Sequence, residues 1–306
     1  MDIYFAVLND IQILHDFYKH TGKKINVMLS FHELNGKVLE TINNYAPYVK
    51  KFMLDSGAFS VYSKPALLKN LKQRFPLYLK NHKDDLEQYC EAVFNLDYMS
   101  GEDEKSRIAN LSMCIDIRKN YENITPVIHS IEIDNKELDE YEYDKPITIG
   151  IGQNKKRKSK DYRPLLQATV NRIKKNSKCH LLGITDYDIL DDVPNIDSCD
   201  SKSWLDYAVS GKVLFNRFDG NKLRQLTIYF PNFVDKATKG EEVAFDEMEQ
   251  LDRESFLWGM NRVFKLTKDD FLNTNQLHSR MLVNIHYELQ KIAYINNKHN
   301  PNLQTK

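Results

Sequence analysis

Short runs of apolar residues recur along the first two thirds of the chain, and each is followed by polar or turn-forming residues. The runs are continuous rather than alternating, as is typical of parallel strands that are covered on both faces. We therefore predict eight buried strands, at residues 3–8, 25–30, 52–54, 92–96, 126–128, 147–151, 180–184 and 196–199.

Longer polar stretches between these runs carry apolar residues that suit the buried face of a helix. They predict helices within residues 65–82, 107–121 and 165–175. The first of these contains Pro76, which is expected to kink or divide the helix. Strands that alternate with helices indicate an α/β fold, and eight strands are the number that closes a (β/α)8 TIM-type barrel.

The pattern changes after about residue 211. Residues 213–215 and 226–230 predict strands outside the repeating unit, and residues 256–264 and 279–295 predict helices. In the last segment the apolar residues share one helix face, because they are spaced by one, three and four positions. We therefore divide the chain into a barrel at residues 1–212 and a small C-terminal α/β appendage at residues 213–306.

Charge and cysteine usage exclude several classes of protein. The formal net charge is zero, so a contact with nucleic acid would have to come from local patches. The four cysteines form no Cys-x-x-Cys pair, which favours reduced thiols over a disulfide framework or a metal site. No apolar run approaches the roughly 20 residues of a membrane span, and the amino terminus lacks the basic start of a signal peptide. We expect a cytoplasmic protein with no membrane partner.

Residues able to do chemistry stand at the ends of several predicted strands. Because the carboxyl ends of all strands meet at one rim of a parallel barrel, we expect these residues to converge into an active site. Glycines at such ends let backbone amides approach a flat ligand closely. The set consists of Asp55, Asp97, His129, Gly150, Gly152, Gly183 and Asp200.

Each of these residues also has an ordinary structural explanation. An aspartate between a strand and a helix is often a helix cap or part of an Asx-turn, which would explain Asp55 or Asp200 alone. His129 would then be a hydrogen-bonded interior histidine, and Phe59 a core residue beyond an ordinary turn. The functional interpretation rests on the recurrence of such residues at matching strand ends.

A basic stretch at residues 154–163 directly follows the predicted strand at 147–151, and so lies at the same rim. Its side chains could hold backbone phosphates near the site, although a solvated charged loop explains them equally well. The candidates are Lys155, Lys156, Arg157 and Lys158. A second basic segment lies at residues 63–83.

Four motifs, in consistent order over residues 50 to 215, resemble those of the tRNA-guanine transglycosylase superfamily. They are Asp55-Ser56-Gly57-Ala58-Phe59 for the family's Asp-Ser-Gly-Gly-aromatic motif, Gly150-Ile151-Gly152 for its Gly-Gly-Leu strand end, Leu181-Leu182-Gly183 for its Leu-Met-Gly strand, and residues 196–201 for its second aspartate motif. The chain is most similar to the branch of DNA 7-deazaguanine transglycosylases found in phages and bacterial modification islands.

Two departures favour this DNA branch over the tRNA enzymes. The tRNA enzymes carry a Cys-x-Cys-x-x-Cys…His zinc site near the C terminus, and this chain has no cysteine after Cys199. The arginine that follows the nucleophile in the tRNA enzymes is also missing. We therefore expect an appendage that lacks the zinc site, with neither a metal nor a cofactor.

The resemblance implies a role for each site residue. Asp200 would be the nucleophile that attacks C1′ of a guanosine nucleotide, and Asp55 would move the proton at N9 of the departing or incoming base. Asp97 and His129 would contact the polar edge of the base, and Gly150 and Gly152 would offer it backbone hydrogen bonds. Ser56 and Gly183 would also line its site. Phe59 would stack on the heterocycle.

The implied activity is exchange of guanine in DNA for a 7-deazaguanine base such as 7-cyano-7-deazaguanine, through a covalent aspartyl-nucleotide intermediate. The implied partners are DNA, the free base and helper proteins such as an ATPase that opens the strands, in the host cytoplasm if the protein is phage-encoded. Three alternatives stay open: base exchange in tRNA, a nucleoside or glycosidic hydrolase that uses the same carboxylates, and a binding protein without catalysis.

Overall fold

The computed structural model describes residues 1–6, 8, 10–97, 103–131, 136–143, 145–152, 161–220, 222–230, 242–272 and 276–299. The chain forms two compact units. Met1–Asn9 and Ile25–Ser201 make up the first, and Asp10–Lys24 and Lys202–Lys306 make up the second.

The first unit is a parallel barrel. Its strands are hydrogen-bonded in the order β5-β4-β3-β2-β1-β9-β8-β7-β6. They are β1 (Asp2–Ala6), β2 (Ile25–Ser30), β3 (Val49–Asp55), β4 (Cys90–Phe94), β5 (Ile124–Thr125), β6 (Val127–Ile128), β7 (Thr148–Ile151), β8 (Lys178–Leu181) and β9 (Ser198–Ser201). All their pairings are parallel.

The barrel closes at Pro126. This proline separates β5 from β6 because it has no N–H to donate to a neighbouring strand, but its carbonyl still accepts the Gly150 N–H at 2.8 Å. On either side of it, β5 pairs with β4 and β6 pairs with β7. Counted as one strand, β5 and β6 reduce the nine strands to eight. The predicted (β/α)8 TIM-type fold is therefore confirmed.

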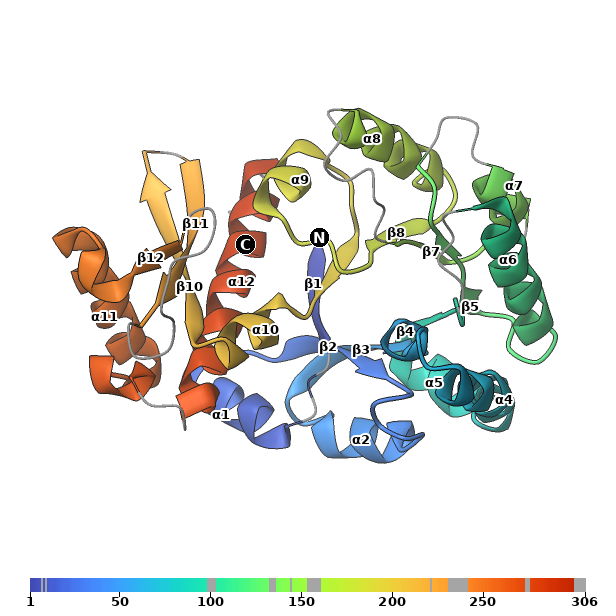
Figure 1. Cartoon of the computed structure of the whole chain (residues 1–306), viewed down its shortest axis with the longest axis horizontal. Helices are drawn as coiled ribbons and strands as arrows, with labels where there is room; N and C mark the ends of the chain where they lie inside the picture. Colours follow the sequence, from blue (N-terminus) through green and yellow to red (C-terminus); the bar gives the residue numbers. More distant parts are fainter. Residues whose placement is uncertain are drawn as a thin grey trace. The chain divides into compact units, whose positions relative to one another are not determined.

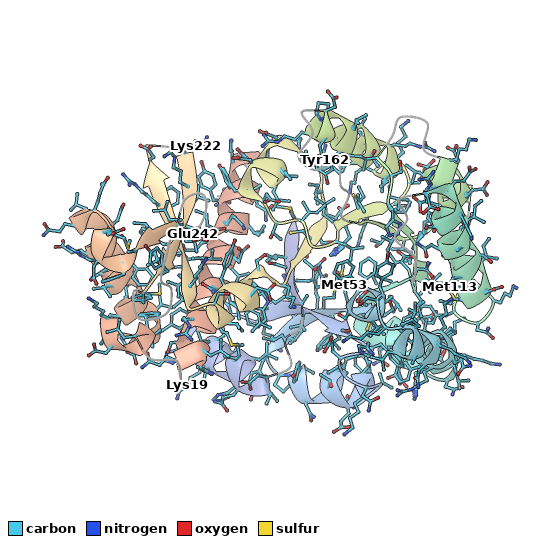
Figure 2. The ribbon with its side chains drawn as sticks, in the orientation of Figure 1. Lys19, Met53, Met113, Tyr162, Lys222 and Glu242 are labelled. Atoms are coloured by element: carbon cyan, nitrogen blue, oxygen red, sulfur yellow. The ribbon has the colours of Figure 1, made fainter. Side chains whose placement is uncertain are left out.

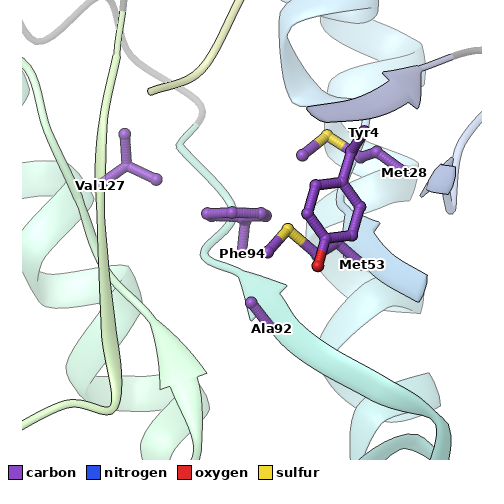
Figure 3. Packing of buried hydrophobic residues seen from close by; sticks show 6 residues of the cluster. All are labelled: Tyr4, Met28, Met53, Ala92, Phe94 and Val127. Carbon is purple, nitrogen blue, oxygen red and sulfur yellow. The ribbon is translucent and has the colours of Figure 1, made fainter. Parts of the chain in front are cut away.

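Side chains fill the barrel interior rather than leaving a pore. A buried cluster joins Tyr4, Met28, Met53, Ala92, Phe94 and Val127, which come from five of the strands around the ring. In Figure 3 the Phe94 ring lies between Val127 on one side and Met53 and Tyr4 on the other. The Tyr4 hydroxyl donates to Glu91 Oε2 at 2.7 Å, so this polar group is satisfied where it is buried.

Helices surround the barrel (Figure 1). They are α2 (Val38–Tyr45), α3 (Ala58–Val61), α4 (Pro65–Asn81), α5 (Lys83–Tyr89), α6 (Glu104–Arg118), α7 (Lys136–Tyr143), α8 (Tyr162–Ile173) and α9 (Tyr187–Asp192). Helix α4 continues through Pro76 and is not divided there; it buries Leu71, Phe75 and Leu79, which follow one another at four-residue spacing. Figure 2 labels Met53 among the strands and Met113 on the outer helix α6.

The second unit contains a small sheet and the long helix α12. Its elements are α1 (Ile11–Thr21), α10 (Ser203–Val209), β10 (Lys212–Asp219), β11 (Lys222–Tyr229), β12 (Glu242–Ala244), η2 (Phe245–Glu247), α11 (Gln250–Phe264), η3 (Lys268–Phe271) and α12 (Leu277–His299). Asn284, buried on α12, accepts the Leu214 N–H at 2.7 Å and donates to the Trp204 carbonyl at 2.8 Å. These bonds tie α12 to β10 and α10.

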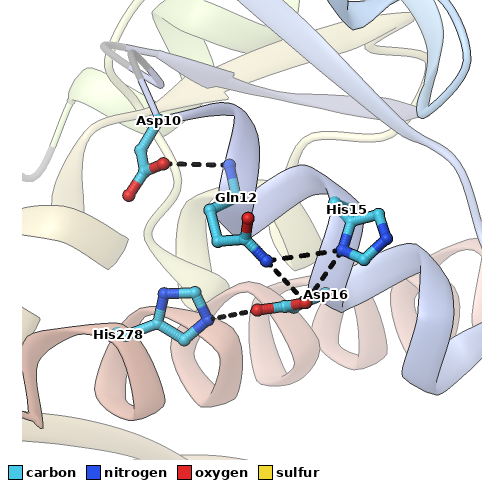
Figure 4. Close-up of polar contacts among 5 residues, drawn as sticks. All are labelled: Asp10, Gln12, His15, Asp16 and His278. Carbon is cyan, nitrogen blue, oxygen red and sulfur yellow. Dashed lines mark hydrogen bonds and ion pairs between the residues drawn. The ribbon is translucent and has the colours of Figure 1, made fainter.

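The division into compact units differs from the predicted boundary at residues 212 and 213. Helix α10 belongs to the second unit, and so does α1, although α1 lies between the first two barrel strands in sequence. Asp16 explains the position of α1, because it pairs with His278 of α12 at 3.0 Å and with His15 at 2.9 Å (Figure 4). The Phe17 and Phe264 rings add an apolar contact between α1 and α11.

Across the described ranges, none of the helices combines the length and apolar character that crossing a bilayer requires.

Candidate active site

Asp200 lies in β9, where two donors hold its carboxylate. The His180 ring contacts Asp200 Oδ1 through Nε2 at 3.2 Å, and the Gly183 N–H donates to the same oxygen at 2.9 Å. Within the described part of the chain, Asp200 Oδ2 has no hydrogen bond. Asp200 is not the N-cap of helix α10, because that position is held by Lys202, whose side chain makes no capping hydrogen bond. Capping therefore does not explain this aspartate.

His180 is fully buried inside the barrel. Its Nδ1 lies 2.8 Å from Ser198 Oγ, so both ring nitrogens have polar neighbours. The arrangement in which Ser198 donates to Nδ1 and Nε2–H donates to Asp200 satisfies all three side chains. The rings of Tyr4 and Phe94 pack against the imidazole. The ring is thus fixed in orientation, and it fixes Asp200 in turn.

Asp55 ends β3, and its Oδ2 accepts the Gly57 N–H at 2.8 Å. Burial raises the pKa of Asp55 to about 6; the Gly57 N–H opposes this rise, and the charge of Asp200 adds to it. The hydrogen bond from the Gly57 N–H forms an Asx-turn, as expected if Asp55 has only a structural role. The charge of Asp200 acts on the pKa of Asp55 in addition, so the two carboxylates interact electrostatically.

The turn after Asp55 buries one predicted residue and exposes another. Ser56 is buried, and its Oγ accepts the Ala58 N–H at 3.2 Å, which places the hydroxyl at the start of α3. The side chain of Phe59 is 91% exposed. The explanation of Phe59 as a core residue is therefore wrong, since the ring is open to a ligand.

Asp97 and His129 lie beside one another, with 3.4 Å between Asp97 Oδ2 and His129 Nε2. Burial raises the pKa of Asp97 to about 7; His129 and the Asn95 amide oppose the rise, and the charges of Glu137 and Asp55 add to it. The buried Asn95 donates to Asp97 Oδ1 at 2.7 Å and to the Asn110 carbonyl at 3.2 Å. It therefore anchors Asp97 to helix α6.

The predicted glycines act mainly through the space they leave. A Cβ atom at Gly150 would lie 3.2 Å from the Phe94 ring, and one at Gly152 would lie 3.2 Å from the His129 ring. The N–H groups of both glycines donate within the barrel, to the carbonyls of Pro126 and Ile128. The expectation that these amides bind a base is therefore wrong, whereas the Gly183 N–H is aimed into the site, at Asp200.

Three residues that contact the predicted set were missed by the sequence reasoning: His180, Glu137 and Asn95. His180 begins the apolar run at residues 180–184, and Glu137 lies in a polar helix without a motif. An inward-facing histidine two residues before the Leu182-Gly183 strand end is a signal that could have been noticed for His180. Glu137 gives no such signal.

Lys155, Lys156, Arg157 and Lys158 lie outside the described residues. Among the residues that are described, no group of three or more His, Cys, Asp or Glu side chains has the geometry to hold a metal ion.

The fold and the site together define a (β/α)8 barrel in which carboxyl and imidazole groups gather at the carboxyl ends of the strands. No protein-family model matches the chain, and neither does any curated protein. A solved structure that does match is provisionally assigned as a fructose-1,6-biphosphate aldolase, from Coccidioides immitis. It is 9% identical, with a TM-score of 0.49, over 97% of this chain and 93% of that one. A likeness of this degree carries no argument about activity.

Proposed function

We propose that the protein is a transglycosylase that exchanges guanine in DNA for a 7-deazaguanine base, such as 7-cyano-7-deazaguanine, through a covalent aspartyl-nucleotide intermediate. One observation carries the proposal: two neighbouring carboxylates have different surroundings. Asp200 is held by two donors, whereas burial and the charge of Asp200 raise the pKa of Asp55 to about 6. Displacement at a glycosidic carbon needs such a division between a nucleophile and a proton-transfer group.

In the first step, Asp200 Oδ2 attacks C1′ of the target nucleotide. The bond between C1′ and N9 breaks and its electron pair stays with the base. Asp55 in its protonated form gives its proton to N9, so guanine leaves as a neutral molecule and Asp55 becomes a carboxylate. With a pKa near neutrality, Asp55 is suited to act in both directions.

In the second step, the Asp55 carboxylate takes the N9 proton of the incoming base. N9 then attacks C1′, the ester bond to Asp200 breaks, and its electron pair returns to the carboxylate. Two displacements place the new base on the same face of the sugar as the old one. The target nucleotide must leave the duplex, or come from a single strand, for Asp200 to reach C1′.

The neighbouring residues suit recognition of a planar base. Phe59 offers an exposed aromatic face on the turn that follows Asp55. Asp97 and His129 supply an acceptor and a donor for the polar edge of the base. The resemblance of the four motifs to the DNA 7-deazaguanine transglycosylases supports the same assignment.

The covalent intermediate provides the test. The protein is incubated with a single-stranded, guanine-containing DNA oligonucleotide without an incoming base, denatured, and analysed by mass spectrometry. We expect an adduct with the mass of the protein plus the oligonucleotide minus guanine. Asp200→Ala should abolish it, whereas Asp219→Ala, which removes an exposed aspartate from the second unit, should not. An adduct of equal yield in Asp200→Ala would disprove the mechanism.

The same preparation separates the rival activities. Adding labelled guanine or 7-cyano-7-deazaguanine together with DNA or tRNA shows which nucleic acid incorporates the base. Incorporation into tRNA alone would replace the DNA substrate, and abasic sites without incorporation would identify a hydrolase. Tight base binding without any adduct would identify a binding protein.

A further inference from the structure

The His129 imidazole lies between two carboxylates that come from different elements. Asp97 follows β4 and lies 3.4 Å from Nε2, whereas Glu137 belongs to α7 and its Oε1 lies 3.5 Å from Nδ1. The side chains are 13% exposed for His129, 14% for Asp97 and 3% for Glu137. Glu137 is therefore the most deeply buried of the three, and the proposed mechanism gives it no role.

Glu137 holds both the backbone and the ring of the same residue. Its Oε2 accepts the His129 backbone N–H at 2.9 Å, while its Oε1 faces the ring nitrogen Nδ1 at 3.5 Å, the distance of an ion pair rather than of a hydrogen bond. On another side, the ring lies against Gly152, where a Cβ atom would come within 3.2 Å of His129 Cδ2. These contacts place Nδ1 beside Glu137 and Nε2 beside Asp97.

Charged groups from several elements act on this row. Burial works to lower the pKa of His129, but the Glu137 and Asp97 carboxylates outweigh it and raise the pKa, while Arg107 of α6 opposes them. Asp55 acts on Asp97 from β3. Among the described residues, Tyr141 interacts electrostatically with Asp97 and Glu137, and Cys114 interacts with Asp97. Arg118 acts on both Tyr141 and Cys114.

We propose that Glu137 is a positioning residue: it keeps His129 Nδ1 on its own side of the ring and Nε2–H beside Asp97 at the base site, so that His129 and Asp97 together recognise a base with a carbonyl beside a ring N–H. This inference rests on the proposed function and assigns a base-specificity role to Glu137. The His129 Nε2–H donates to the carbonyl oxygen, and the Asp97 carboxylate accepts from the ring N–H. Guanine, hypoxanthine and 7-deazaguanine present this pattern, whereas adenine presents an amino donor beside a ring acceptor.

The experiment compares the wild type with Glu137→Gln, which keeps the shape of the side chain but removes its charge. Glu140→Gln is the matched control, because it removes the same charge from an exposed position of the same helix. Titration of the His129 ring by NMR, assigned with a His129→Gln variant, gives a measurement that does not depend on catalysis. Calorimetry with guanine and adenine gives the specificity, and far-UV circular dichroism verifies that each variant is folded.

In Glu137→Gln we expect the His129 pKa to fall and the affinity for guanine to drop about tenfold, the effect of one weakened charge-assisted hydrogen bond. The already weak affinity for adenine should change little, so the discrimination between the bases should narrow. Glu140→Gln should match the wild type in every measurement. Glu137→Asp, which keeps the charge on a shorter side chain, should recover part of the rise in the His129 pKa and part of the guanine affinity.

An unchanged His129 titration, or an unchanged ratio of guanine to adenine affinity, in folded Glu137→Gln would overturn the inference. The adduct assay keeps this result distinct from the proposed function. If the wild type forms the adduct and Glu137→Gln binds both bases with wild-type affinity, the proposed function would stand and the role of Glu137 would fall. If the wild type forms no adduct, but Glu137→Gln lowers both the guanine affinity and the His129 pKa, the role of Glu137 would stand and the proposed transglycosylase function would fall.

Discussion

Gly57 offers the sharpest test of how the turn after Asp55 is built. Its φ is +79°, in the left-handed region, and a Cβ atom added there would lie 2.5 Å from His32 Cβ and 2.6 Å from Ser30 Oγ. Its N–H also donates to Asp55 Oδ2 at 2.8 Å. We therefore predict that Gly57→Ala destabilises the barrel and displaces the turn that holds Asp55.

The magnitude has two parts. The left-handed backbone costs a residue with a Cβ atom about 1–2 kcal/mol, and overlap with packed neighbours costs about 1–3 kcal/mol more. The sum is about 2–5 kcal/mol, a large share of the roughly 5–15 kcal/mol by which a folded protein is stable. His32 Cβ is attached directly to the backbone, so the overlap is relieved only if the chain itself moves.

Gly36→Ala is the matched control, because Gly36 lies in the same unit with a φ of +82°. A Cβ atom there would meet Arg74 Nη2 at 3.2 Å, the far end of a flexible side chain. Gly36→Ala therefore has the free-energy cost of the left-handed backbone but not that of overlap with packed neighbours. Urea unfolding followed by circular dichroism should separate the two variants by about 1–3 kcal/mol. Equal destabilisation would refute the packing argument, and with it the claim that Gly57 is required by its neighbours.

Three further predictions concern the site itself. Because Phe59 is 91% exposed, Phe59→Ala should change the unfolding free energy by less than about 0.5 kcal/mol. The same variant should weaken guanine binding by about 1–3 kcal/mol in calorimetry. An unchanged guanine affinity would argue against stacking of the ring on the base. His180→Phe keeps an aromatic ring at this buried position but removes the ring nitrogens that face Ser198 and Asp200, at a cost of about 1–3 kcal/mol in unfolding free energy. Adduct formation should slow in a protein that still folds, and a wild-type rate would contradict the positioning of Asp200. Burial raises the pKa of Asp97 from 3.8 to about 7, so the folded state binds this proton more tightly, and the resulting stabilisation is lost as the pH rises from about 4 to about 7. The unfolding temperature of Asp97→Asn should therefore rise relative to that of the wild type across this pH range. A constant difference between the two unfolding temperatures would contradict the raised pKa.

The barrel strands were predictable because each is a continuous apolar run that needs no distant partner to be recognised. Each of the eight predicted runs overlaps an observed strand when β5 and β6 are counted together, with bounds that differ by up to three residues. The positions of Asp55, Asp97, His129 and Asp200 followed from the same pattern, since a parallel barrel brings all carboxyl ends to one rim. The exposure of Phe59 was not predictable, because an aromatic residue after a Ser-Gly turn is compatible with the core and with the surface alike.

The sequence by itself therefore determined the fold class and which acids lie at the strand ends. Only the tertiary structure decided which side chains act together. His180 contacts Asp200, which lies 20 residues further along the chain. Glu137 of α7 accepts a hydrogen bond from His129, which follows β6. No local sequence pattern predicts either contact. The use of the Gly150 and Gly152 amides is likewise decided by tertiary structure, because whether an N–H is available depends on the strand beside it. Helix α1 joined the second unit through Asp16 and Phe17, whose partners lie more than 200 residues further along the chain.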